Sequence, residues 1–311
     1  MTAEAVAAIA PAQMTLLSGR SSDLGAGLMV QRLLPQRALR MLGPWCFLDL
    51  IGPVTFGPGE GLDVAPHPHI GLQTVTWLAS GALLHKDSLG YAQRIEPGQL
   101  NLMTAGAGIA HSEESPPDSR APLFGVQFWV ALPENAQCCE PAFDHLTDLP
   151  VFEQGGVKVC VIMGTLGHLM SPARCYSPLV AAELSSAAGG ELSLALDPAF
   201  DYGLCVLSGT AALQGETTEP QAAVIPGQLC FLGGGRSTLG ITLSAGARCI
   251  LLGGQPFVRP VKIWWNFVAH KEETIRSALD DWNNGRRFLP VEAYEGARLE
   301  APPWPDNARL K

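Results

Sequence analysis

Short apolar runs and turn-forming residues alternate along nearly the whole chain. Runs rich in Val, Ile, Leu, Thr and Trp, such as TVTWLASG, GVQFWVALP and VKVCVIMG, are separated by glycine and proline. Runs of this length with such boundaries are typical of short β-strands. The pattern therefore predicts an all-β fold, either a sandwich or a barrel.

One segment near the C-terminus has a helical pattern instead. Ile275, Leu279 and Trp282 follow one another at i, i+4 and i+7, which places them on one face of a helix. Acidic residues precede this stripe and a glycine follows it, as expected for the two ends of a helix. We predict a helix over about 270–284, whose apolar stripe packs on the β body.

The sequence also contains an internal repeat. The segment IEPGQLNLMTAG at 95–106 recurs as VIPGQLCFLGGG at 224–235, and a predicted strand ending in Ser-Gly precedes each copy. The glycine of Ser-Gly and the proline of the repeat are 16 residues apart in the first copy and 17 in the second. We infer two β-domains of similar topology in tandem, expected at 15–140 and 151–311, with the helix in the second.

Composition narrows the class of protein. The 311 residues are 47% hydrophobic and only 16% charged, with a net charge of −9, so the chain is too apolar to be disordered. The acidic balance disfavours a nucleic-acid surface, which needs a basic face. No run of 18 apolar residues and no basic leader stands in the sequence. We therefore expect no membrane contact and a cytoplasmic location.

Eight cysteines are scattered through the chain without a CxxC motif, which favours reduced thiols in the core. Cys138 and Cys139 are adjacent. We favour the interpretation that they are two free thiols in a loop over the interpretation that they form a redox switch, because adjacent cysteines form a disulfide only with strain.

Two pairs of polar residues in the first repeat carry the candidate chemistry. On a strand, His67 and His69 point to the same face, as do His111 and Glu113. If the two strands are neighbours, three imidazoles and a carboxylate converge. This donor set suits a divalent first-row transition metal with room for water, substrate or dioxygen. The remaining histidines are isolated in the sequence: His85, His145, His168 and His270.

Three further roles follow from strand parity. Glu113 is either a metal ligand or, in another rotamer, a general base. Gln73 lies an even number of residues from His67 and His69, so its side chain is expected on the same face. An amide is a weak neutral ligand, so we predict that Gln73 hydrogen-bonds beside the metal or lines the pocket. Trp77 is either a pocket wall or an ordinary core residue.

The second repeat provides an internal control for the metal assignment. Aligning the Ser-Gly and PGQL markers puts Ala195 and Asp197 at the positions of the first histidine pair. Gly240 and Thr242 then take the positions of the His-Glu pair. No imidazole stands at these positions, so we predict a metal site in the first domain alone.

Several motifs together resemble a known family. GPWCFLDLIGP, HPHIG and TAGAGIAHSE are similar to the pirin family of bicupins, in particular its bacterial members. The resemblance is dense over about 20–135 and weaker through the second repeat. It implies two tandem cupin jelly-roll barrels and one divalent metal per chain in the first. Fe(II) is favoured, with Mn, Ni, Cu, Co or Zn as alternatives, at the positions of His67, His69, His111 and Glu113.

The resemblance also implies two different functions. Some pirins are quercetin 2,3-dioxygenases, which would give this chain a flavonol-like aromatic substrate and O₂ as reactants. Others are non-catalytic, redox-sensing regulators that bind a transcription factor or a metabolic enzyme. A third hypothesis is a cupin enzyme, either a dioxygenase or an isomerase, that acts on another substrate.

Charge and local sequence bear on this choice. Three neutral imidazoles and one carboxylate leave a divalent metal with a net charge of +1, which a deprotonated flavonol hydroxyl would neutralise in an apolar pocket. Ile70, Leu72 and Gln73 stand where animal pirins have a basic, an aromatic and an acidic residue. The site is therefore expected to have less polar surroundings, and a partner surface of the animal type is not expected.

Overall fold

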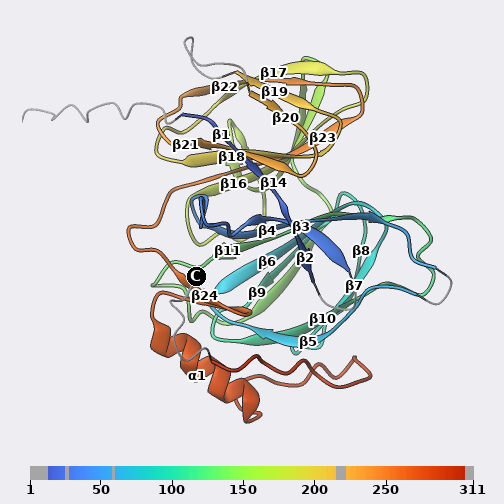
Figure 1. The fold of residues 1–311 in the computed structure, drawn as a ribbon, viewed down its shortest axis with the longest axis vertical. Coiled ribbons are helices and arrows are strands. Elements are labelled where there is room, and N and C mark those ends of the chain that lie inside the picture. Colours follow the sequence, from blue (N-terminus) through green and yellow to red (C-terminus); the bar gives the residue numbers. More distant parts are fainter. Residues whose placement is uncertain (1–12, 25–27, 58–59, 215–221, 305–311) are drawn as a thin grey trace, which may run out of the picture. The chain divides into compact units, whose positions relative to one another are not determined.

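The computed structural model describes residues 13–24, 28–57, 60–214 and 222–304. Within these ranges it consists of many β-strands and the helix α1 (Figure 1). Contacts between residues divide the chain into two compact units. Of the described residues, the first contains those in Arg20–Asp148 and 257–304, and the second contains those in Leu149–Pro256 and 13–19.

Two antiparallel sheets form the body of the first unit. The larger has the order β12-β9-β6-β11-β4-β3-β2, and the smaller has the order β5-β10-β7-β8. The strands of the larger sheet are β2 (Arg20–Asp23), β3 (Met29–Leu34), β4 (Trp45–Val54), β6 (Leu72–Ser80), β9 (Leu100–Thr104), β11 (Leu123–Ala131) and β12 (Ala142–Leu146). The strands of the smaller sheet are β5 (Asp63–His69), β7 (Leu83–Asp87), β8 (Ala92–Ile95) and β10 (Ile109–Glu114).

Apolar residues from both sheets form the core of the first unit. Val30, Ile51 and Leu78 of the larger sheet belong to the same buried cluster as Val64 and Leu83 of the smaller one. The strands β4, β6 and β11 are buried on both faces along most of their length, which accounts for the short continuous apolar runs of the sequence. Two antiparallel sheets closed over one core are the arrangement of a cupin jelly roll.

The C-terminal segment belongs to the first unit. It contains β24 (Lys262–Trp264), β25 (Phe267–Ala269) and α1 (Glu272–Asn283). Figure 1 draws α1 beside β5 and β10. The helix begins and ends within two residues of the predicted limits.

The predicted apolar stripe of the helix is buried. Ile275, Leu279 and Trp282 share a cluster with Ile70 and Ala110 of the first unit. We expected the helix within a domain at 151–311, and the contacts place it differently. The reason is that the apolar partners of the stripe lie on and next to the strands β5 and β10, which precede the helix by more than 150 residues in the sequence.

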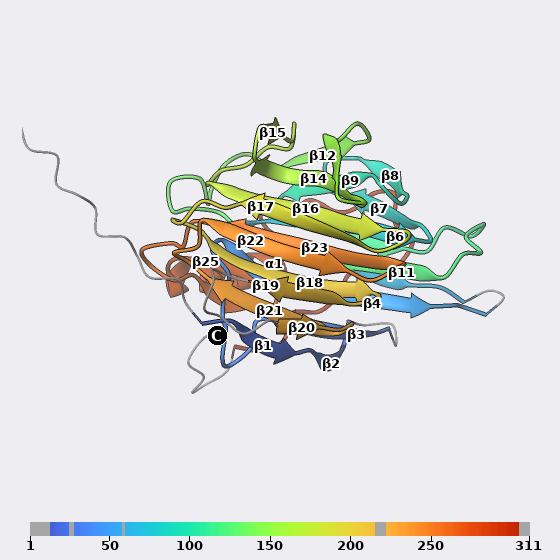
Figure 2. The same ribbon diagram turned by 90° about the horizontal axis from the view of Figure 1, so that it is seen from above.

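The second unit is built in the same way. Its larger sheet has the order β1-β21-β18-β23-β16-β14-β13, with β15 paired to β14, and several of these strands lie side by side in Figure 2. Its smaller sheet has the order β17-β22-β19-β20. The strands are β1 (Thr15–Ser18), β13 (Val151–Gln154), β14 (Val157–Leu166), β15 (Leu169–Met170), β16 (Leu179–Ser186), β17 (Gly190–Ala195), β18 (Asp201–Ser208), β19 (Ala211–Gln214), β20 (Ala222–Val224), β21 (Gln228–Gly233), β22 (Thr238–Leu243) and β23 (Ala247–Gly254).

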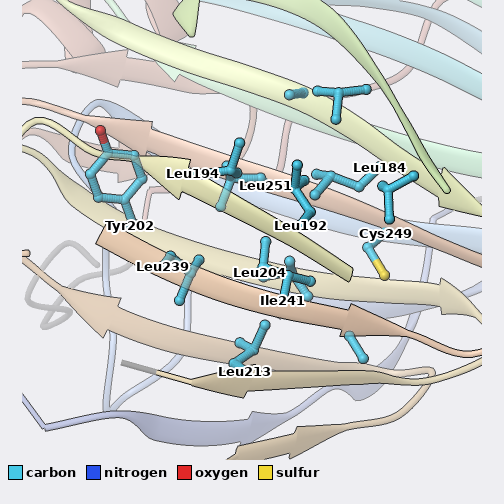
Figure 3. Close-up of a cluster of buried hydrophobic side chains, with 14 of the residues drawn as sticks. Leu184, Leu192, Leu194, Tyr202, Leu204, Leu213, Leu239, Ile241, Cys249 and Leu251 are labelled. Carbon is cyan, nitrogen blue, oxygen red and sulfur yellow. The ribbon is translucent and has the colours of Figure 1, made fainter. Parts of the chain in front are cut away.

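Strand order confirms the internal repeat. In the smaller sheets, β17-β22-β19-β20 matches β5-β10-β7-β8, and in the larger sheets β21-β18-β23-β16-β14-β13 matches β9-β6-β11-β4-β3-β2. The pair β17 and β22 therefore occupies the place that β5 and β10 take in the first unit. In the second unit this region is apolar core, and Figure 3 shows Leu192, Leu194 and Ile241 pointing toward Leu204 and Leu251.

None of the helices in the described part of the chain has the length and apolar character that crossing a membrane requires.

Candidate metal centre

The strands β5 and β10 are antiparallel neighbours, as the metal prediction required. In their register His67 lies opposite His111, and His69 lies opposite Ile109. All three imidazoles are buried, and one nitrogen of each lies within 4.8 Å of the others. Among the described residues, no other group of three or more His, Cys, Asp and Glu is gathered in this way. The structure therefore contains a three-histidine candidate metal site.

Hydrogen bonds to main-chain carbonyls fix two of the rings. Nδ1 of His67 donates to the carbonyl of Ala65, and Nδ1 of His69 donates to the carbonyl of Asn266, both at 3.0 Å. The Nε2 atoms of these two rings carry no proton when Nδ1 is the donor, so they are available as ligands.

The spacing of the ligand atoms fits a metal ion. Nε2 of His69 lies 3.1 Å from Nε2 of His111. Two nitrogens bound at about 2.1 Å from one ion, at roughly a right angle, are about 3.0 Å apart. With both nitrogens unprotonated, a shared cation would attract them at this separation. The donor set and its spacing thus fit a divalent transition metal.

Burial keeps the three rings neutral. Loss of hydration lowers the pKa of His67, and it holds the pKa values of His69 and His111 well below the usual range. Repulsion from His67 lowers the pKa values of the other two rings further. Because only a neutral imidazole binds a metal, the fold prepares the ligands at neutral pH.

His85, which is isolated in the sequence, lies next to this group. Its Nδ1 lies 3.3 Å from Nδ1 of His111, and its Nε2 lies 3.1 Å from a carboxylate oxygen of Asp87. With Nε2 of His111 facing the metal site, a chain of donors runs from His111 through His85 to Asp87. The sequence signal was the alternation His-Lys-Asp on β7, which pairs with β10.

Glu113 lies near the histidines but is held by other residues. A register shift between β10 and β5 separates it from His111, and such bulges redirect side chains. Its carboxylate accepts hydrogen bonds from the amide of Gln127 at 2.8 and 2.9 Å and from Thr76 at 3.4 Å. The three-histidine group does not include it. Gln127 was missed by the sequence reasoning because it stands on β11, in the other sheet.

Gln73 and Trp77 lie on β6, in the larger sheet. The amide of Gln73 donates to the hydroxyl of Thr104 at 2.9 Å. Both side chains are almost fully buried, and neither is among the residues that line the cavity beside the histidines. Their predicted roles beside the metal therefore gain no support from the cavity lining.

A cavity of about 370 Å³ adjoins the centre and is lined by His67, Glu113 and Gln127. Four aromatic side chains are among its lining residues. Phe47 and Trp129 stack with ring centroids 4.1 Å apart, and the rings of Trp129 and His69 are nearly perpendicular, with centroids 5.1 Å apart. The other aromatic and cationic lining residues are Trp264, Trp265, Arg20 and Arg32. The cavity thus joins a metal-ligand group, a buried carboxylate and flat apolar surfaces, the combination typical of a small-molecule site.

Fold and site together define a bicupin with a three-histidine candidate metal centre in its first unit. The Pirin family model matches residues 27–130, and the model of the Pirin C-terminal cupin domain matches residues 181–288. The chain belongs to the pirin family.

Similar proteins cover nearly the whole chain. A Pseudomonas aeruginosa protein named "Putative quercetin 2,3-dioxygenase" is 48% identical over 93% of this chain and 90% of its own length. A pirin-like protein of Caulobacter vibrioides is 39% identical over 88% of this chain and 94% of its own. The crystal structure of a quercetin 2,3-dioxygenase from Acinetobacter baumannii superposes with a TM-score of 0.90 and 41% identity, covering 96% and 98% of the two chains.

Proposed function

We propose that this pirin is a metal-dependent dioxygenase that cleaves quercetin-like flavonols with O₂. The observation that carries the proposal is the cavity with aromatic lining residues, because His67 and Glu113 both line it. A ligand group and a candidate base thus face one space in which a planar substrate can lie. The names of the similar proteins from Pseudomonas aeruginosa and Acinetobacter baumannii agree with this activity.

His67, His69 and His111 would hold one divalent metal per chain, with Fe(II) favoured, and Glu113 would be the fourth ligand or the base. When bound, the metal supplies a Lewis acid that accepts an anionic oxygen of the substrate. The main-chain carbonyls of Ala65 and Asn266 keep two of the rings oriented for this role.

Glu113 would take the proton of the flavonol 3-hydroxyl. A carboxylate oxygen can accept it while the Gln127 amide still donates to the other oxygen, so the side chain keeps its place in both protonation states. The aromatic side chains that line the cavity would contact the substrate rings. The overall reaction adds both atoms of O₂ to the flavonol and releases one carbon as carbon monoxide.

The experiment loads the metal-free protein with Fe(II), Mn, Ni, Cu or Co in turn and follows flavonol absorbance together with O₂ uptake. We expect equal consumption of flavonol and O₂ with at least one metal. The Glu113→Gln variant keeps the shape of the side chain but lacks the base, so its kcat should fall by about 10²-fold or more.

Absence of turnover with every metal, in protein that holds one ion per chain, would exclude the flavonol reaction. A metal-binding regulator would then be the better reading.

A further inference from the structure

The hairpin formed by β24 and β25 brings its tip to the candidate metal centre. Trp264, Trp265 and Asn266 line the same cavity as His67. The carbonyl of Asn266 accepts the hydrogen bond from Nδ1 of His69 at 3.0 Å. A loop almost 200 residues away in the sequence therefore contributes both to the cavity wall and to the orientation of a candidate ligand.

Trp265 has a backbone conformation that its side chain disfavours. The hairpin has a two-residue loop, Trp265-Asn266, and φ of Trp265 is +51°. Two-residue hairpins with a positive φ at the first loop position prefer glycine there, because a Cβ atom crowds the backbone. A bulky residue kept in such a conformation indicates a role for its side chain, provided that the surroundings fix the loop.

Several contacts fix the C-terminal segment against the strand that carries two of the ligands. The amide of Val268 donates to the carbonyl of Ile70 at 3.2 Å, and the amide of Leu299 donates to the carbonyl of Pro66 at 2.8 Å. The hydroxyl of Tyr294 donates to Asp63 at 2.8 Å. The bond from Val268 and the bond that Asn266 accepts from His69 hold the hairpin next to the histidines, and the other two hold the end of the C-terminal segment on β5.

The indole of Trp265 is supported on the side of the C-terminal segment. Its ring meets Phe267 edge-on at 5.6 Å and lies 6.4 Å from the ring of Trp282. It remains partly exposed, and it lines the cavity together with the stacked pair Phe47 and Trp129. The cavity thus has one aromatic wall from the strands of the barrel and another from the C-terminal hairpin.

We propose that Trp265 is a specificity-determining residue, which makes the metal centre select planar aromatic chelators over small aliphatic ones. The inference rests on the metal site of the proposed function but not on turnover. A flat ring bound through its oxygens would gain contact with the indole, whereas a small aliphatic chelator would not reach it.

The test measures binding to the metal-loaded full-length protein without O₂. The two probes are 4-nitrocatechol, a planar aromatic chelator with a visible absorption band, and acetohydroxamate, a small aliphatic one. For Trp265→Gly we expect nitrocatechol to bind about tenfold more weakly and acetohydroxamate to bind within about twofold of the wild type. Glycine suits the positive φ, so the hairpin should keep its shape. Trp265→Phe should restore most of the nitrocatechol affinity.

Arg287→Gly is the matched control. Arg287 is the other non-glycine residue with a positive φ among the described residues, and it does not line the cavity. This variant should bind both probes like the wild type. Unchanged nitrocatechol affinity in Trp265→Gly would overturn the proposal. Equal weakening of both probes, or loss of bound metal, would also overturn it, because the hairpin would then be only structural.

Failure of this proposal and failure of the flavonol reaction are distinguishable. Selective loss of nitrocatechol binding, in a protein that never consumes flavonol, would support the role of Trp265 and exclude the proposed reaction. Flavonol turnover together with unchanged chelator selectivity in Trp265→Gly would support the proposed reaction and overturn the role of Trp265.

Discussion

The amide nitrogen of Gln127 lies 2.8 and 2.9 Å from the two carboxylate oxygens of Glu113. Both side chains are buried, and they come from different sheets, β11 and β10. A buried carboxylate needs such donors because it has lost its hydration. This one amide thus joins the two sheets of the first unit at the candidate base.

Removing the Gln127 amide should therefore affect both catalysis and stability. In Gln127→Leu the Glu113 carboxylate loses its fixed orientation and its strongest donor. We expect kcat for flavonol to fall at least tenfold and the free energy of unfolding to fall by about 1.5–3 kcal/mol. Steady-state kinetics and urea titration of the metal-free protein measure the two effects.

Thr76→Val is the control for this change, because the contact of Thr76 with the same carboxylate and its contact with the Gln127 amide are both long, at 3.4 Å. Its effects should be clearly smaller. If Gln127→Leu is as active as the wild type, the amide does not position Glu113 for catalysis.

The orientation of His111 should depend on Asp87. One oxygen of Asp87 accepts from the main-chain amides of Leu89 and Tyr91, and the other faces Nε2 of His85. In Asp87→Asn the amide oxygen keeps the two main-chain donors, which leaves the NH₂ group facing His85. The proton of His85 then moves to Nδ1, and the ligand nitrogen of His111 must carry a proton.

We expect Asp87→Asn to weaken metal binding by about 10–100-fold while the protein stays folded. Competition with a coloured chelator measures the metal affinity. Asp118→Asn changes an exposed carboxylate and should have no effect. Wild-type affinity in Asp87→Asn would mean that the tautomer of His111 is set by another contact.

Two of the three candidate ligands can be tested separately from the reaction. His67→Ala and His111→Ala each remove one nitrogen from a group whose ligand atoms lie within 4.8 Å, so metal should no longer be retained after gel filtration. His168→Ala, at an exposed position, should retain one ion per chain. Metal analysis decides the outcome, and equal retention in all three variants would show that the ligands lie elsewhere.

The sequence predicts those parts of the site that depend on residues close together in the chain, and not those that depend on distant strands. Strand alternation is local, so it was enough to place His67 and His69 on one face. The roles of His85 and Gln127 depend on which strands pair and which sheets face each other, and local residue patterns do not show either.

In the C-terminal segment, too, the local pattern was predictable and the long-range packing was not. The spacing of Ile275 and Leu279 predicted the helix and its apolar stripe, but not the surface that the stripe covers. That surface is formed by Ile70 and Ala110 of the first unit. The hairpin tip at Trp265 reaches the cavity for the same reason, because the segment packs against β5.

Thiol reactivity should separate the exposed cysteine from the buried ones. Cys138 is exposed, whereas burial raises the pKa values of Cys46 and Cys205 to about 12. Only the thiolate reacts with iodoacetamide, and at pH 8 a thiol of pKa about 12 is ionised to roughly one part in 10⁴. In the native protein Cys138 should be alkylated first, and Cys46 and Cys205 should react only after denaturation.

Mass spectrometry of labelled peptides identifies the reacting thiols, and Cys138→Ser should remove the fastest phase. Rapid labelling of Cys205 in the native state would show that the core of the second unit opens readily. A native protein in which Cys138 resists alkylation until a reductant is added would instead indicate a disulfide at this position, and the preference for two free neighbouring thiols would be wrong.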